Sequence, residues 1–182
     1  MVSWVASSVF HARDYVVTER ADYFAAGSNV LFGLYLAGVR IGRLDLDGSG
    51  FDAGYGGGKR GSNWKKTVLR LWTLLCLAVY MAHVSFLSFV RWDYTYNMAA
   101  NIVVGAVANV SWIVYSVGRW YMHGKTGSGI ERGWMLWPTW IVLWVIAAMS
   151  MEVLEFVPWR LMVDAHSLWH LGTVGPTVWW YW

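Results

Sequence analysis

The chain alternates long uncharged stretches with short polar connections, a pattern that predicts membrane-spanning helices. The uncharged stretches are Tyr23–Val39, Leu71–Val90, Tyr94–Gly118, Gly133–Met151 and Ala165–Trp182. A helix rises about 1.5 Å per residue, so about 17–25 apolar residues cross a bilayer core. Since all five stretches have this length, the pattern predicts about five full spans.

The first residues, Met1–Ala12, are also uncharged but too short for a full span. They lack the basic start and the cleavage site of a signal peptide. We interpret them as the second half of a helix, which predicts that the chain is truncated at its N-terminus. The expected fold class is all-α: a polytopic transmembrane helix bundle with a partial first helix, forming one membrane domain over residues 1–182.

Composition excludes an ordinary soluble domain. Charged residues make up 14% of the chain and hydrophobic residues 57%, whereas soluble domains contain about 25% charged residues. The 15 tryptophans suit a protein whose aromatic rings lie at membrane–water interfaces. The single cysteine, Cys76, excludes an internal disulfide framework. A net charge of +3 is too small to indicate a nucleic-acid partner.

The distribution of basic residues predicts the orientation. The longest polar segment, residues 42–66, is rich in glycine and is expected to be a flexible loop. Ten of the 14 basic residues lie in this loop, its flanks and the connection after Tyr94–Gly118, and four lie on the other side. The basic side should be cytosolic. The opposite ends of the spans, near His11, Asp22 and Asp164, are then lumenal or external.

Ionisable residues at membrane depth are costly, so each is a candidate functional residue. Ser7 and His11 are four positions apart, as are His166 and His170, and such pairs share one face of a helix. Three histidines at one membrane face, with an open fourth position, form a catalytic zinc arrangement. Asp22 is placed to hold or deprotonate a zinc-bound water at that open position. Ser7 is placed to donate a hydrogen bond to the same water or to a developing oxyanion. Histidines in helical bundles also hydrogen-bond neighbouring helices, and spacing alone leaves both interpretations open.

Two further residues are candidates for hydrogen-bonding and orienting a zinc-binding histidine. Asp164 precedes the last span and could orient a zinc-binding histidine, although a helix N-cap is the favoured interpretation. His83 lies inside the span Leu71–Val90, where a hydrogen bond between helices is the favoured interpretation.

Four segments then carry a family resemblance: Trp4–Asp14, Thr18–Phe24, Phe86–Asn101 and Asp164–His170. Together they resemble the post-GPI-attachment-to-proteins factor 3 family, whose fungal members are named for protein processing in the endoplasmic reticulum. That family belongs to the CREST superfamily of seven-helix membrane proteins, with alkaline ceramidases and adiponectin/progestin receptors. The superfamily pattern is Ser-x-x-x-His on one helix, Asp on the next and His-x-x-x-His on the last.

The resemblance implies a zinc site and an activity. His11, His166 and His170 would hold Zn²⁺, while Asp22 and Ser7 would hold its water, the nucleophile. The implied function is GPI-anchor lipid remodelling by hydrolysis of the sn-2 acyl ester, a phospholipase A2-type reaction. The implied partners are GPI-anchored proteins and their lipid. The implied location is the endoplasmic reticulum membrane, or the Golgi as in some family members, with the active site facing the lumen.

Three alternatives to this function remain at the level of sequence. The same zinc chemistry could hydrolyse the amide of ceramide. A lipid-sensing receptor or a non-catalytic factor for GPI-anchored cargo could keep the same polar residues. An inactive fragment is the third alternative, because the family's first helix and its lumenal, cysteine-bearing region are absent from this chain.

Overall fold

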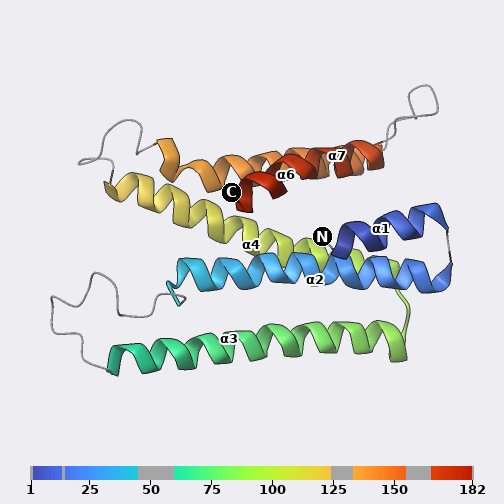
Figure 1. Cartoon of the computed structure of the whole chain (residues 1–182), viewed down its shortest axis with the longest axis horizontal. Coiled ribbons are helices and arrows are strands. Elements are labelled where there is room, and N and C mark those ends of the chain that lie inside the picture. Colours follow the sequence, from blue (N-terminus) through green and yellow to red (C-terminus); the bar gives the residue numbers. More distant parts are fainter. Residues whose placement is uncertain (1, 14, 45–59, 124–132, 155–164, 182) are drawn as a thin grey trace. The chain divides into compact units, whose positions relative to one another are not determined.

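The computed structural model describes residues 2–13, 15–44, 60–123, 133–154 and 165–181, and Figure 1 shows its helices in chain order. These are α1 (Val2–Ala12), α2 (Val16–Ile41), α3 (Arg60–Ser85), the π-helical turn η2 (Phe86–Val90), α4 (Tyr94–His123), α6 (Trp137–Leu154) and α7 (Ala165–Tyr181). The described residues contain no strand, so the prediction of an all-α fold is confirmed.

Three of the described helices are long and apolar enough to cross a membrane: Val16–Ile41, Asn63–Val90 and Tyr94–Met122. The sequence predicted about five full spans, and the other two predicted stretches form shorter helices. The apolar part of α6 is Trp137–Met151, and α7 has 17 residues. A helix of that length rises about 26 Å, slightly less than a hydrocarbon core of about 30 Å.

The start of α6 explains part of this difference. Leu136 lies in a turn whose amide N–H donates to the Gly133 carbonyl at 3.2 Å, and α6 begins at Trp137. Pro138 follows directly, and proline is tolerated in the first turn of a helix because it lacks an amide N–H. The proline thus sets the helix start inside the uncharged stretch.

The predicted loop over residues 42–66 is shorter in the structure. Residues 42–44 form a turn, and α3 already begins at Arg60, so residues 60–66 are helical. Residues 45–59 lie outside the described part of the chain. Charge marked the loop boundary in the sequence, but a helix can continue past the hydrocarbon because lysine side chains reach the interface.

Contacts between residues divide the chain into two compact units, Met1–Ala108 (unit 1) and Asn109–Trp182 (unit 2). The division falls within α4. Each unit is described by itself.

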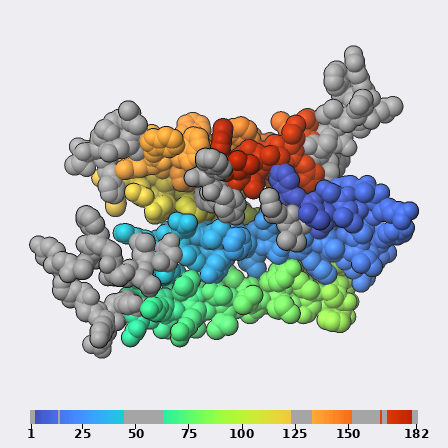
Figure 2. Space-filling view, viewed as in Figure 1, coloured from blue at the N-terminus to red at the C-terminus, as the bar shows by residue number. Residues whose placement is uncertain are grey.

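In unit 1, α2 packs against both α1 and α3. Figure 2 shows the side chains of α2 and α3 in contact along the two helices. Trp72 of α3 donates its indole N–H to the Tyr35 carbonyl of α2 at 3.1 Å, and the Tyr80 hydroxyl donates to the Phe24 carbonyl at 3.1 Å. In an apolar environment such bonds are favoured because the alternative leaves a polar group unsatisfied.

The other face of α3 is apolar and exposed. Its exposed side chains include Leu71, Leu74, Leu75, Leu77 and Met81, each more than half exposed. Large contiguous apolar surfaces are rare on soluble monomers. This face therefore fits contact with lipid, in agreement with the membrane assignment.

In unit 2, α6 and α7 pack closely through small residues. A Cβ added at Gly172 would lie 3.0 Å from the Cβ of Ala148, so these backbones approach each other as small residues allow. The indole N–H of Trp144 donates to the Gly172 carbonyl at 3.0 Å. The α4 residue Ser116 adds a link, because its hydroxyl donates to the Met135 carbonyl at 2.7 Å.

The contact between Gly38 and Trp72 generates a stability prediction. A Cβ at Gly38 would lie 2.6 Å from Cε2 and Nε1 of Trp72, so Gly38→Ala forces the indole away from its bond to Tyr35. Overpacking of this kind costs about 1–3 kcal/mol. We expect Gly38→Ala to lower the thermal unfolding temperature of the detergent-solubilised protein.

Gly33→Ala is the matched control on the same helix, because no atom lies within 4 Å of a Cβ at that position. It should unfold at or above the wild-type temperature, since alanine favours a helix over glycine. Equal unfolding temperatures for the two variants would contradict the close packing of α2 on α3.

Candidate functional site

Three of the predicted site residues lie on the packed helices α1 and α2 of unit 1. Ser7 and His11 are both in α1, and Asp22 lies in α2 after the connection at residues 13–15. Ser7 and Asp22 are half-buried, and His11 is exposed. The two helices are neighbours, so one end of unit 1 carries a hydroxyl, an imidazole and a carboxylate.

The connection between α1 and α2 is fixed by hydrogen bonds to Thr18. Its hydroxyl oxygen accepts from the Tyr15 amide at 3.0 Å, and the hydroxyl lies 2.8 Å from the Arg13 carbonyl. A threonine in the first turn satisfies a backbone N–H that the helix itself leaves without a partner. Glu19 in the first turn of α2 adds a favourable interaction with the helix dipole. The sequence thus holds the reversal that brings Asp22 back beside α1.

An aromatic cluster joins this end of unit 1 to the connection between α3 and α4. Tyr23 stacks on Trp92 with ring centroids 5.5 Å apart and an interplanar angle of 4°. Phe10 of α1 lies 6.5 Å from Tyr23, edge to face, and Tyr94 lies 5.8 Å from it. Such pairs contribute about 0.5–1.5 kcal/mol each beyond the area that they bury. Phe10 adjoins His11 and Tyr23 adjoins Asp22, so the cluster fixes the backbone beside two of the predicted site residues.

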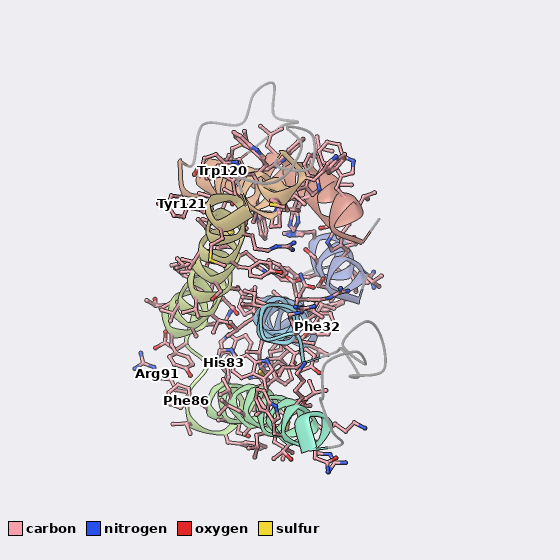
Figure 3. The ribbon with its side chains drawn as sticks, turned by 90° about the vertical axis from the view of Figure 1, so that its left-hand side faces the viewer. Phe32, His83, Phe86, Arg91, Trp120 and Tyr121 are labelled. Carbon is pink, nitrogen blue, oxygen red and sulfur yellow. The ribbon has the colours of Figure 1, made fainter. Side chains whose placement is uncertain are left out.

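His83 belongs to a second, polar cluster in unit 1. Its Nε2 lies 3.1 Å from Oδ1 of Asn97, which also accepts from Nδ2 of Asn101 at 3.3 Å. Asn97 is buried, and Gly27 of α2 lies beside the cluster: a Cβ there would lie 3.5 Å from Oδ1 of Asn101 and 3.8 Å from Nε2 of His83. Figure 3 shows His83 among the helices of unit 1, whereas Arg91 points away from them. The favoured interpretation of His83, a hydrogen bond between helices, is confirmed.

His166 and His170 both lie within α7 of unit 2, so the predicted placement on one helix is confirmed. The His170 ring is half-buried and lies 4.4 Å from the Trp169 ring. The His166 side chain lies outside the described part, as does Asp164. The roles predicted for these residues stay predictions.

The zinc site itself also stays a prediction. The residues described by the structure contain no group of three His, Cys, Asp or Glu side chains able to hold a metal. The predicted set includes the His166 side chain and is divided between the two units. Its donor chemistry fits zinc, because three imidazole nitrogens with one open position are typical of catalytic zinc.

Apart from His83, sequence reasoning assigned no role to the residues that build the two clusters. Phe10, Tyr23 and Trp92 lie in the segments that carry the family resemblance, but no individual role followed from that or from the general aromatic excess. Asn97 and Asn101 offered a clearer signal, because two carboxamides four positions apart in an uncharged stretch share a helix face. Their partner His83 could not be identified from spacing, since it lies on another helix.

Comparison with known proteins identifies a matching family and several similar proteins. Residues 1–182 match the Per1-like family. The chain is 42% identical over 176 residues to "Protein PER1 homolog" of Schizosaccharomyces pombe, which covers 96% of this chain and 46% of that protein. It is 30% identical over 190 residues to "Protein PER1" of Saccharomyces cerevisiae, covering 97% and 48%. It is also 30% identical over 172 residues to the human "GPI-specific phospholipase A2-like PGAP3", covering 94% and 45%.

The chain therefore spans about half the length of these relatives. No solved structure is detectably similar to it.

The polar cluster around Asn97 generates the next prediction. Asn97→Leu removes an oxygen that accepts two hydrogen bonds and leaves polar groups of His83 and Asn101 in an apolar environment. Hydrogen bonds between membrane helices contribute about 0.6–2 kcal/mol each, so we expect a clear fall in thermal unfolding temperature. Asn101→Leu removes one of these bonds and should lower it less. An Asn101→Leu effect equal to or larger than that of Asn97→Leu would contradict the central role of Asn97.

Proposed function

Because this chain belongs to the Per1-like family, we propose that it hydrolyses the sn-2 acyl ester of the GPI lipid during GPI-anchor remodelling. The observation that supports the proposal is that Ser7 and His11 lie on α1 and Asp22 on α2, two helices that pack against each other. The name of the human relative, a GPI-specific phospholipase A2-like protein, supports the reaction class. The three apolar helices of spanning length support a lipid substrate.

The proposed chemistry assigns one role to each polar residue. His11, His166 and His170 would hold Zn²⁺, which as a Lewis acid would lower the pKa of a water to about 7. Asp22 would accept a proton from the attacking water as the general base. Ser7 would donate a hydrogen bond to the oxygen that becomes negatively charged as the carbonyl is attacked. The half-burial of Ser7 and Asp22 suits these roles, because a carboxylate and a hydroxyl act more strongly where water is partly excluded.

The proposed location is the endoplasmic reticulum membrane, with the site facing the lumen. The α1–α2 connection, with His11 and Asp22 near it, lies at the opposite end of α2 from Arg40. The end of α2 near Arg40 continues into the basic segment 42–66, which the positive-inside rule assigns to the cytosol. A lumenal site would reach GPI-anchored proteins in the secretory pathway.

Substitution of the general base tests the reaction. Asp22→Asn keeps the shape of the side chain but does not accept the proton, so sn-2 deacylation of GPI lipid should fall about 100-fold or more. The assay is release of the sn-2 acyl chain in cells that lack the endogenous activity, with protein level and location measured in parallel. His83→Gln is the matched control, because it keeps a hydrogen-bonding side chain beside Asn97 and should retain most of the activity. Full activity of Asp22→Asn would contradict hydrolysis at this site and favour a non-catalytic role.

Metal analysis of the purified protein tests the proposed ligands without an activity assay. Purified wild-type protein should contain close to one equivalent of zinc, and the double variant His166→Ala/His170→Ala should contain almost none. His83→Ala is the control for loss of any histidine and should keep its zinc. A wild-type protein that is folded but free of zinc after purification without chelators would contradict the metal site.

A further inference from the structure

At the end of unit 1 where His11 and Asp22 lie, Arg20 packs on an aromatic platform formed by Trp92 together with Tyr23 and Phe24. Arg20, Tyr23 and Phe24 occupy positions i, i+3 and i+4 of α2, which share one face of the helix. All three contact one indole. The Arg20 guanidinium lies 5.1 Å from the ring centroid of Trp92, Tyr23 stacks on it at 5.5 Å, and Phe24 meets it edge to face at 5.9 Å.

This platform orients a cation without neutralising it. A guanidinium over an aromatic face is attracted by the electrons of the ring, and its charge remains. The N–H groups of a guanidinium lie in its plane, so packing against a ring leaves its edge able to donate. The Arg20 side chain is exposed at this end of α2. Guanidinium edges bind the oxygens of a phosphate in pairs, which makes Arg20 suited to a phosphodiester.

The position of Arg20 relates this cation to the proposed hydrolytic site. Arg20 precedes Asp22 by two residues on α2, and Phe10, which contacts the platform through Tyr23 at 6.5 Å, precedes His11 on α1. In a glycerophospholipid the phosphate and the sn-2 ester are attached to adjacent carbons of glycerol. A site that attacks this ester therefore needs a group that accommodates the phosphate close by.

Another arginine of the same end has a different environment. Arg91, in the connection before α4, lies 3.4 Å from the carboxylate of Asp93 and has a side chain 75% exposed. An ion pair of this kind already satisfies part of the guanidinium and is screened by water. Arg91 thus provides a matched control: an exposed arginine of the same end that packs on no ring of the platform.

We propose that Arg20, positioned by Trp92, binds the headgroup phosphodiester of the lipid substrate and sets the preference of the site for phosphate-bearing lipids. The inference rests on the proposed function and adds a residue that determines substrate specificity. Trp92 is a positioning residue, since it acts through Arg20.

Lipid binding by the full chain in detergent tests this assignment separately from hydrolysis. The probes are short-chain phosphatidylinositol, diacylglycerol of the same chain length, and inorganic phosphate, titrated by calorimetry. Arg20→Gln should weaken phosphatidylinositol binding about 10–100-fold, as expected for the loss of charge-assisted hydrogen bonds. Diacylglycerol binding should not change. Arg20→Lys should recover part of the affinity, because it restores the charge without the paired donors.

Control variants distinguish phosphate binding by Arg20 from non-specific electrostatic attraction and from loss of the folded structure. Arg91→Gln should bind phosphatidylinositol like the wild type, and an equal loss in both arginine variants would overturn the assignment. Trp92→Leu should reproduce the Arg20→Gln loss, while Trp92→Phe should restore binding by keeping a ring under the guanidinium. Inorganic phosphate should compete only weakly, and competition as strong as that of the lipid would overturn the lipid assignment. Unfolding temperatures identify any variant that has lost its fold. If Arg20→Gln is such a variant, the phosphatidylinositol affinity of Arg20→Lys is compared with that of the wild type instead.

The same variants distinguish failure of this inference from failure of the proposed function. Asp22→Asn should bind phosphatidylinositol with wild-type affinity while losing hydrolysis. In the assay of hydrolysis, Arg20→Gln should raise KM about tenfold or more and leave kcat nearly unchanged. Arg20-dependent binding without any hydrolysis by the wild type would support the headgroup assignment and contradict the hydrolase. Hydrolysis with unchanged KM in Arg20→Gln would contradict the headgroup assignment alone.

Discussion

The cost of leaving a polar group without a partner in hydrocarbon is the constraint on which this structure depends. Each unsatisfied backbone group costs several kcal/mol there, and helices satisfy these groups internally. The same cost explains why side chains such as Trp72 and Tyr80 bond to carbonyls of the neighbouring helix. It also explains why the few ionisable residues within the helices are informative, since a membrane protein retains them only where they gain a partner or a function.

Unit 1 links its helices in two ways, by hydrogen bonds at one place and by aromatic packing at another. Within the bundle, His83, Asn97 and Asn101 satisfy one another and link α3 to α4. At the end of the helices, rings rather than hydrogen bonds make the links: Trp92 packs on Tyr23, and Arg20 packs on Trp92. The polar cluster therefore has a structural role, whereas the aromatic cluster leaves His11 and Arg20 exposed near the half-buried Asp22.

Much of the fold could be predicted from the sequence, because charge and hydrophobicity report directly on membrane depth. The uncharged stretches located the helices, yet they misjudged their ends: α3 begins at Arg60 in the predicted loop, and the turn at Leu136 shortens α6. The spacing of Ser7 with His11 and of His166 with His170 placed each pair on one helix. Spacing could not show that Asn97 bonds His83 or that Trp92 supports Arg20, because these contacts join residues distant in sequence.

The zinc proposal requires α1 and α7 to contribute ligands to one metal site, and the proximity of their histidines can be measured. A short thiol cross-linker, applied to His11→Cys/His170→Cys in a Cys76→Ser background, measures this proximity in the membrane. The pair Ala148→Cys/Gly172→Cys is the positive control, since a Cβ at Gly172 would lie 3.0 Å from that of Ala148. A shared zinc site predicts an intramolecular cross-link between positions 11 and 170. Failure of this pair to cross-link while the control pair does so would contradict a site shared by α1 and α7.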